Sequence, residues 1–397
     1  MVDIATFGTF AVAAVASLFM AWAIGAGSSG STPFAPAVGA NAISVMRAGF
    51  LVGLLGFAGA VLQGANVSEA VGTGLIGGVT LSSLAATIAL LIAAGLVAIG
   101  IFTGYPIATA FTVTGAVIGT GLAMGGDPAW AKYTEIATLW VLTPFVGGGI
   151  AYAVARALRA EVVAEEYLIV VLAAVVGAIV ANIEFAILGS PGAGGASIAQ
   201  VAGGSLPGPA IAGTAAATLV IAAAWAGAIA LDLNNGTERG ERHFLLILGG
   251  LVAFSAGGSQ VGLAIGPLIP LSGELELPLI AMLVGGGFGL LIGSWTGAPR
   301  MIKAISQDYS SLGPRRSIAA LIPSFIIAQA AVFYGIPVSF NEIIVSAIIG
   351  SGYAAAGAGG GVSPRKMGFT VLAWVGSLAG SIVVSYVGYA AVAAILL

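Results

Sequence analysis

Uncharged apolar runs of about 20 residues recur along the whole sequence, and they constrain the fold more than any other feature. A membrane-spanning α-helix needs a run of about that length. Only 7% of the 397 residues are charged and 59% are hydrophobic, whereas roughly a quarter of the residues of a soluble domain are charged. The runs are continuous and do not alternate with polar residues, as the strands of a transmembrane barrel would. The sequence therefore predicts an all-α polytopic membrane protein embedded in the lipid bilayer.

The apolar windows predict about 12 transmembrane helices. The expected spans are residues 5–26, 47–66, 82–102, 105–125, 136–157, 167–188, 209–232, 244–262, 278–297, 316–334, 338–358 and 368–393. The chain begins MVDIATFG, which is acidic where a secretory signal peptide is basic, so we expect the first run to be a retained span. No polar segment between the spans is long enough to form a soluble domain.

The basic residues predict the orientation in the membrane. With these spans, the loops on one side hold every lysine and arginine except Lys132. By the positive-inside rule that side is cytoplasmic. We therefore expect a multi-pass protein of the cell (plasma) membrane with both termini outside. The charged segment from Asp232 to His243 is interpreted as a solvated cytoplasmic turn.

The sequence lacks the residue types that most catalytic sites use. The chain has no cysteine, and His243 is its single histidine, which excludes disulfides, thiolate metal sites and a Ser-His-Asp triad. Membrane-embedded enzymes need aspartate clusters for Mg²⁺ or paired catalytic residues between spans, and the sequence offers neither. A net charge of −3, spread thinly, gives no reason to expect nucleic acid as a partner. We expect a protein that is not an enzyme and holds no metal.

A repeat is visible in the helix-breaking residues. The segment SSGSTPFAPAV, from Ser28, aligns with SQVGLAIGPLI, from Ser259, at an offset of 231 residues. The same offset aligns GYP, from Gly104, with GIP, from Gly335, and the two turns lie on opposite sides of the expected membrane. The pattern predicts two inverted-topology five-helix repeats with broken or re-entrant segments, which is typical of secondary transporters with a site near the membrane midplane. The expected units are the first repeat (1–160), two connecting helices with a cytoplasmic loop (161–242) and the second repeat (243–397).

Both copies resemble a known family. FSAGGSQVGLAIGPLI, from Phe254, resembles the second-half signature GANDVANAIGP of inorganic phosphate transporters of the PiT (Pho-4) family. The first-half copy falls on SSGSTPFAPAVG, the Gly-x-Pro elements resemble the family segment GLPVSTTHA, and FTVLAWVGSLAGSIVVSYV, from Phe369, resembles its closing helix. The resemblance covers both repeats. It implies a secondary active transporter, or permease, for inorganic phosphate that is coupled to H⁺ or Na⁺ and works by alternating access at the repeat interface.

The residues taken to hold phosphate and the cation in that family are replaced in this chain. The family sequence Asn-Asp-x-x-Asn corresponds to Ser28, Ser29 and Thr32, and in the second half to Ser259, Gln260 and Leu263. The family sequence Ser-Thr-Thr-His corresponds to residues 108–111 and 339–342. Both aspartates that would pair with Na⁺ are absent, so transport of another oxyanion such as sulfate, a passive anion channel and a non-transporting sensor all stay open.

Hydroxyls and amides beside these helix breakers form the candidate anion site, because such donors and helix N-termini hold anions. The candidate substrate- or ion-binding residues are Ser28, Ser29, Ser31, Thr32, Thr109, Ser259, Gln260, Ser339, Asn341 and Glu342. The alternative for each hydroxyl is that it permits close helix packing and bonds to the preceding turn. Glu342 lies within a predicted span, where a carboxylate is costly, so we expect it either to carry a proton or to be a protonated or paired structural group. Glu184 is expected at the outer membrane surface.

The expected partners are small. They are inorganic phosphate or a similar anion, with H⁺ or Na⁺ as the coupling ion and no other cofactor. The 62 glycines allow helices to approach closely, and such faces permit a homodimer. The direction of transport is not encoded in any feature of the sequence.

Overall fold

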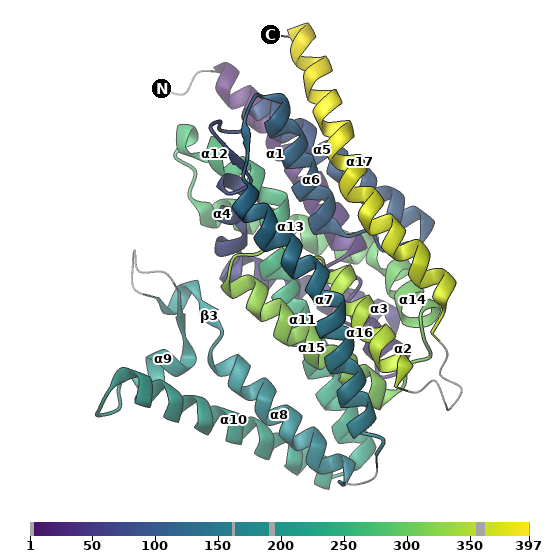
Figure 1. Ribbon diagram of the computed structural model, residues 1–397. Helices are drawn as coiled ribbons and strands as arrows, with labels where there is room; N and C mark the ends of the chain where they lie inside the picture. Colours follow the sequence, from purple (N-terminus) through teal and green to yellow (C-terminus); the bar gives the residue numbers. More distant parts are fainter. Residues whose placement is uncertain (1–3, 161–162, 190–194, 355–361, 397) are drawn as a thin grey trace.

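Helices make up almost all of the computed structural model, which describes residues 4–160, 163–189, 195–354 and 362–396 (Figure 1). Nine helices of this part are long and apolar enough to cross a membrane. Its strands form only two short antiparallel pairs. The predicted all-α polytopic membrane fold is confirmed.

The helices fall into two similar series joined by a helical arm. The first series is α1 (Ile4–Gly27), α2 (Ala35–Gly39), α3 (Val45–Gln63), α4 (Ala65–Thr73), β1 (Ile76–Gly77), α5 (Ser83–Thr103), α6 (Thr109–Ala123), β2 (Asp127–Pro128) and α7 (Trp130–Ala157). The arm is α8 (Glu165–Ala181), β3 (Glu184–Phe185), η1 (Ala186–Leu188), β4 (Ala196–Ser197), α9 (Ile198–Gly203) and α10 (Ala210–Asn234). The second series is α11 (Thr237–Ile265), η2 (Gly266–Leu268), α12 (Ile269–Ser272), η3 (Gly273–Leu275), α13 (Leu279–Thr296), α14 (Ala298–Asp308), α15 (Pro314–Phe333), α16 (Phe340–Tyr353) and α17 (Pro364–Leu396).

The two series match at the offset found in the sequence. α5 and α15 begin at Ser83 and Pro314, and α6 and α16 begin at Thr109 and Phe340. The packing also repeats: α1 contacts α5 and α13, while its counterpart α11 contacts α15 and α3. In Figure 1 the counterparts α7 and α17 run in opposite directions, since α17 ends near the labelled termini and α7 runs away from them toward α8. The repeats are therefore interlocked, each packing its first helix against the third helix of the other.

Three of the 12 expected spans correspond to helices that are shorter than expected by five residues or more. α6, α16 and α8 hold 15, 14 and 17 residues, so the expected spans 105–125, 338–358 and 167–188 are wrong in length, and residues 355–358 lie outside the described part. α6 and α16 begin late because each follows a Gly-x-Pro turn. Gly104 and Gly335 adopt the left-handed φ angles 75° and 63°, which side chains other than glycine rarely adopt. α6 and α16 are thus repeat-related half-helices.

The polar segment after α1 is a break in one repeat only. α1 ends at Gly27, and the chain turns through residues 28–34, which include Pro33, before α2 begins. In the second repeat α11 runs unbroken through Ser259 and Gln260 to Ile265. Its first proline in this region is Pro267, which lies in η2. The expectation of broken segments holds here for the first copy and is wrong for the second.

Glycines let the helices of the two repeats touch at their backbones. A Cβ atom added at Gly257, on α11, would lie 1.8 Å from the carbonyl oxygen of Gly56, on α3. One added at Gly350, on α16, would lie 2.0 Å from the carbonyl oxygen of Gly148, on α7. Only glycine permits such an approach, as expected of helix pairs in membranes.

Candidate functional site

Three predicted side chains from both repeats meet in a buried cluster. The Thr109 hydroxyl donates to the Gln260 amide oxygen at 2.7 Å, and its oxygen lies 3.3 Å from the Ser28 hydroxyl. Ser28 also donates to the same Gln260 oxygen at 3.2 Å. All three side chains have no exposed surface. The break after α1, the start of α6 and the C-terminal part of α11 are therefore joined at one point.

The N-terminal ends of both half-helices approach this cluster. The Gln260 amide nitrogen donates to the carbonyl of Val338, just before α16, at 2.6 Å. The Asn341 amide nitrogen donates to the carbonyl of Ile107, just before α6, at 2.7 Å, and to that of Gly27 at 2.9 Å. Ile107 and Val338 are equivalent positions of the repeat, so each half-helix is held at its start by an amide. The first N–H groups of a helix have no partner within it and favour negative charge nearby.

Several polar atoms of the predicted residues have no partner among the described residues. They are the hydroxyl oxygens of Ser259 and Ser339, Oδ1 of Asn341 and Oε2 of Glu342. Buried polar groups almost always have a partner, and one without asks for an explanation such as a ligand. Glu342 is also the only acidic or basic side chain that is buried in the described part of the chain.

Three of the predicted hydroxyls bond to their own turn. Ser31 and Thr32 donate to the carbonyl of Ser28 at 3.2 and 3.0 Å. Ser29 makes a long bond of 3.5 Å to the carbonyl of Ile24. These contacts fit the structural alternative, in which the hydroxyls replace the hydrogen bonds that the helix loses at its break.

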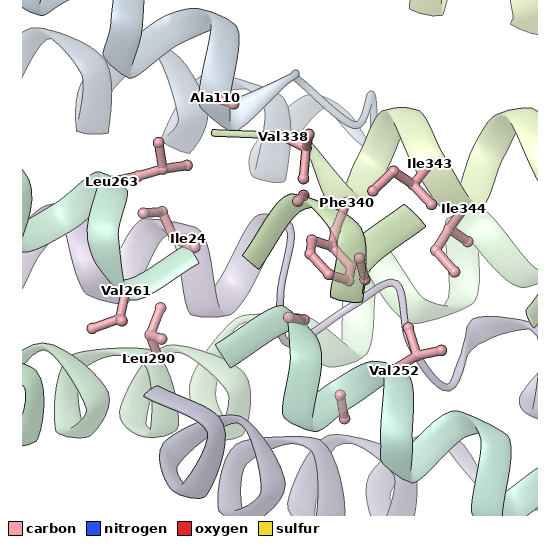
Figure 2. Close-up of a cluster of buried hydrophobic side chains, with 14 of the residues drawn as sticks. Ile24, Ala110, Val252, Val261, Leu263, Leu290, Val338, Phe340, Ile343 and Ile344 are labelled. Carbon is pink, nitrogen blue, oxygen red and sulfur yellow. The ribbon is translucent and has the colours of Figure 1, made fainter. Parts of the chain in front are cut away.

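The polar cluster is enclosed by apolar side chains. The ten predicted residues are at most 3% exposed. Figure 2 shows part of the buried apolar core, including Ala110, Val261, Val338 and Phe340, each of which is next to a predicted site residue in the chain. Among the described residues no three histidine or acidic side chains come together as metal ligands. The site thus offers hydroxyls, amides, helix ends and one carboxyl group.

Two tryptophans that the sequence analysis did not select hold the Gly-x-Pro turns. The Trp374 indole, on α17, donates to the carbonyl of Pro106 at 2.8 Å. The Trp140 indole, on α7, donates to the carbonyl of Pro337 at 2.9 Å. Each turn is therefore held by the last helix of the other repeat. The signal was present in the sequence as a pair of tryptophans at nearly equivalent positions of the repeats.

A large cavity lies elsewhere, in a groove between the arm, the first repeat and the second repeat. Its volume is about 1210 Å³, and none of the ten predicted residues lines it. Gln63 and Gln329 lie on its wall, where the two amides contact each other and Gln329 donates to Ser255 at 2.6 Å. Glu184 lines the same groove and is partly exposed, and its place at the outer membrane surface stays a prediction.

The two interlocked repeats, each with a half-helix that begins at the buried polar cluster, define a multi-pass membrane transporter fold. A solved structure described as "The sodium-dependent phosphate transporter" has this fold, with a TM-score of 0.79, 22% identity and coverage of 98% of this chain and 100% of that chain. Residues 24–385 match the model of the phosphate transporter family. The chain belongs to the phosphate transporter family, as the sequence resemblance implied.

Two relatives illustrate the match. The chain is 27% identical over 362 residues to a predicted phosphate permease of Thermococcus kodakarensis, covering 84% of this chain and 86% of the relative. It is 24% identical over 394 residues to the chloroplastic inorganic phosphate transporter 2-1 of Arabidopsis thaliana, covering 85% of this chain and 64% of that protein.

Proposed function

We propose that the protein is a permease that carries inorganic phosphate across the cell membrane by alternating access. The observation that carries this proposal is the meeting of the α6 and α16 N-termini at the buried cluster of Ser28, Thr109 and Gln260. Helix N-termini and neutral donors bind oxyanions without a fixed positive charge. Membership of the family and the names of the relatives support phosphate as the anion.

The proposed coupling ion is H⁺, with Na⁺ as the alternative. Glu342 lies at the start of α16, buried and with one carboxyl oxygen unpaired. A carboxyl group buried at membrane depth is much less costly when it is neutral, which favours the protonated form of Glu342. A proton carried together with the anion would also cancel part of the negative charge that crosses the membrane. A Na⁺ ion normally has several oxygen ligands including a carboxylate. Ser28, Thr109 and Gln260 supply oxygens but no carboxylate, so Glu342 is the one carboxyl group of the site that either a proton or Na⁺ could use. We assign it to the proton because the two family aspartates that would pair with Na⁺ are replaced in this chain.

The proposed cycle uses the repeats as the two moving bodies. Residues 1–160 and 243–397 would rock against each other, with 161–242 connecting them, and both termini would lie outside the plasma membrane. The Gly104 turn would then close the site on the cytoplasmic side and the Gly335 turn on the outer side. The enclosure of the ten site residues supports a closed state between these two openings.

Uptake into liposomes tests the proposal. Purified protein is reconstituted, and uptake of labelled phosphate is measured with an inward proton gradient, an inward Na⁺ gradient, or neither. The proposal expects saturable uptake that follows the proton gradient and stops when an uncoupler dissipates it. Uptake that follows only the Na⁺ gradient would reassign the coupling ion while leaving the permease intact.

The same assay decides the remaining alternatives. Uptake of labelled sulfate without uptake of phosphate would contradict phosphate as the substrate. Flux that continues in both directions without any gradient dependence would indicate a passive channel. Saturable phosphate binding with no flux would indicate a sensor.

A further inference from the structure

Two arginines lie together in a small pocket where α3 and α11 begin. The pocket has a volume of about 420 Å³ and its wall includes Arg47 and Arg242. Arg47 belongs to the first turn of α3, a helix of membrane-spanning length, and Arg242 lies in the second turn of α11, against which α3 packs. The pocket therefore lies at the boundary between the membrane and water, far along both helices from Gln260 and the central cluster.

Neither guanidinium has an acidic partner among the described residues. Arg242 donates through Nε to the carbonyl of Ala42 at 2.9 Å, which fixes its stem and leaves its terminal nitrogens available. The nearby Asp232 is already paired with His243 at 2.6 Å. Other basic residues, such as Arg315 and Lys366, do have carboxylate partners. Arg47 and Arg242 thus form no ion pair with an acid in the described part of the chain.

The pocket has an apolar side that faces outward. Met46 and Phe50, one helical turn apart on α3, are 68% and 52% exposed. Leu51 and Leu246 complete this side. Exposed side chains of this kind on a membrane-spanning helix contact acyl chains. A small free anion would gain nothing from them, whereas a lipid would contact them below its headgroup.

We propose that the Arg47–Arg242 pocket binds the phosphate group of an anionic phospholipid, with its acyl chains along Met46, Phe50 and Leu246. Guanidinium groups match phosphate oxygens with two parallel hydrogen bonds. The N-terminus of α3, whose Ser44 cap makes no side-chain bond, adds a weaker attraction for negative charge. Basic pockets between helices at the cytoplasmic surface are suited to anionic headgroups. This site does not depend on the proposed transport activity.

Lipid titration of the purified full chain tests the proposal. In detergent, phosphatidylglycerol or phosphatidylcholine is added and bound lipid is counted by native mass spectrometry, with the melting temperature measured in parallel. The wild type is expected to bind phosphatidylglycerol more tightly than phosphatidylcholine. R47Q/R242Q should lose affinity for phosphatidylglycerol on the order of tenfold and lose its stabilisation by this lipid. Native-like melting without added lipid shows that the variant is folded, and the single variants replace it if it is not.

The control variant R156Q/R365Q removes the same charge at the ends of two other helices, where both side chains are exposed, and should bind as the wild type does. An equal loss of phosphatidylglycerol affinity in both double variants would show that only the net charge matters, and it would contradict the proposed lipid site. Retained selectivity in R47Q/R242Q would overturn it as well. Inorganic phosphate is titrated in a separate arm. If phosphate alone raises the melting temperature of the wild type but not of R47Q/R242Q, the site holds a free anion and the lipid assignment is wrong.

Discussion

Thr109 and Gln260 lie 151 residues apart in the chain, and the hydroxyl of one donates to the amide oxygen of the other at 2.7 Å. Gln260 uses its amide nitrogen to hold Val338 at 2.6 Å. One side chain on an unbroken helix therefore joins the starts of both half-helices. Gln260 therefore bonds to two residues of the first repeat, Ser28 and Thr109, and to Val338 of its own repeat.

Replacing Gln260 by leucine should impair phosphate binding more than folding. The change removes the oxygen that accepts from the Thr109 and Ser28 hydroxyls and the only amide that donates to the Val338 carbonyl among the described contacts, at a cost of about 1–3 kcal/mol. It also removes the link between the half-helices. We expect the KM for phosphate uptake to rise about tenfold or more. Gln329→Leu is the matched control, because it removes a buried amide from the groove network outside the site. If both variants lower the melting temperature and neither changes KM, Gln260 has only a structural role.

Replacing Glu342 by glutamine should remove the dependence of uptake on the proton gradient. Glutamine keeps the size of the side chain but cannot take up a proton. In the wild type we expect uptake to fall as the external pH rises, because the coupled proton becomes scarcer. In Glu342→Gln the remaining uptake should be the same at every pH tested. Glu184→Gln, on the groove wall, should keep the wild-type profile, and an unchanged profile in Glu342→Gln would exclude this residue as the proton carrier.

The repeat could be predicted from the sequence because it is defined by glycines and prolines, which determine the backbone conformation of the residues next to them. Gly104 and Gly335 adopt left-handed backbone, and Pro33 disfavours helical backbone in the residue before it, so these residues act through the chain next to them. The constant offset between these two glycines predicted that α6 and α16 begin at equivalent positions of the two repeats. The bounds of the long helices α5 and α15 could also be predicted to within a few residues, because the length of an apolar run is a local property of the sequence.

The partners of the site residues could not be predicted, because they depend on distant contacts. Ser28 and Thr32 are four residues apart and both hydroxyls, yet one contacts Gln260 and the other bonds its own turn. The difference arises from which side of the break faces α11. The continuity of α11 through Gln260 could not be predicted either, because its small residues resemble those of the break after α1. The clearest difference is that Pro33 has no counterpart in α11. Direct contact of the two N-termini appears only once both repeats are folded.

The tryptophan bonds to the Gly-x-Pro turns should control which side of the site opens. Trp374→Phe frees the Pro106 carbonyl and Trp140→Phe frees that of Pro337, at a cost of about 1 kcal/mol each. Because the chain has no cysteine, Ala110→Cys introduces a single thiol beside Thr109, at a buried position. We expect this thiol to react faster with a membrane-impermeant reagent added on the side of the loosened turn. Equal acceleration from both sides in both variants would point to general loosening and contradict a role in sidedness.

The backbone contact between Gly56 and Gly257 should make the α3–α11 pair intolerant of even one methyl group. An alanine at position 257 would place its Cβ 1.8 Å from the Gly56 carbonyl oxygen, so the helices must separate. Overpacking of this kind costs about 1–3 kcal/mol, and we expect a lower melting temperature in detergent together with reduced uptake. Gly285→Ala is the control, because a Cβ atom there meets no atom within 4 Å, and its stability should equal or exceed that of the wild type. A Gly257→Ala protein as stable as this control would show that α3 and α11 separate at little cost.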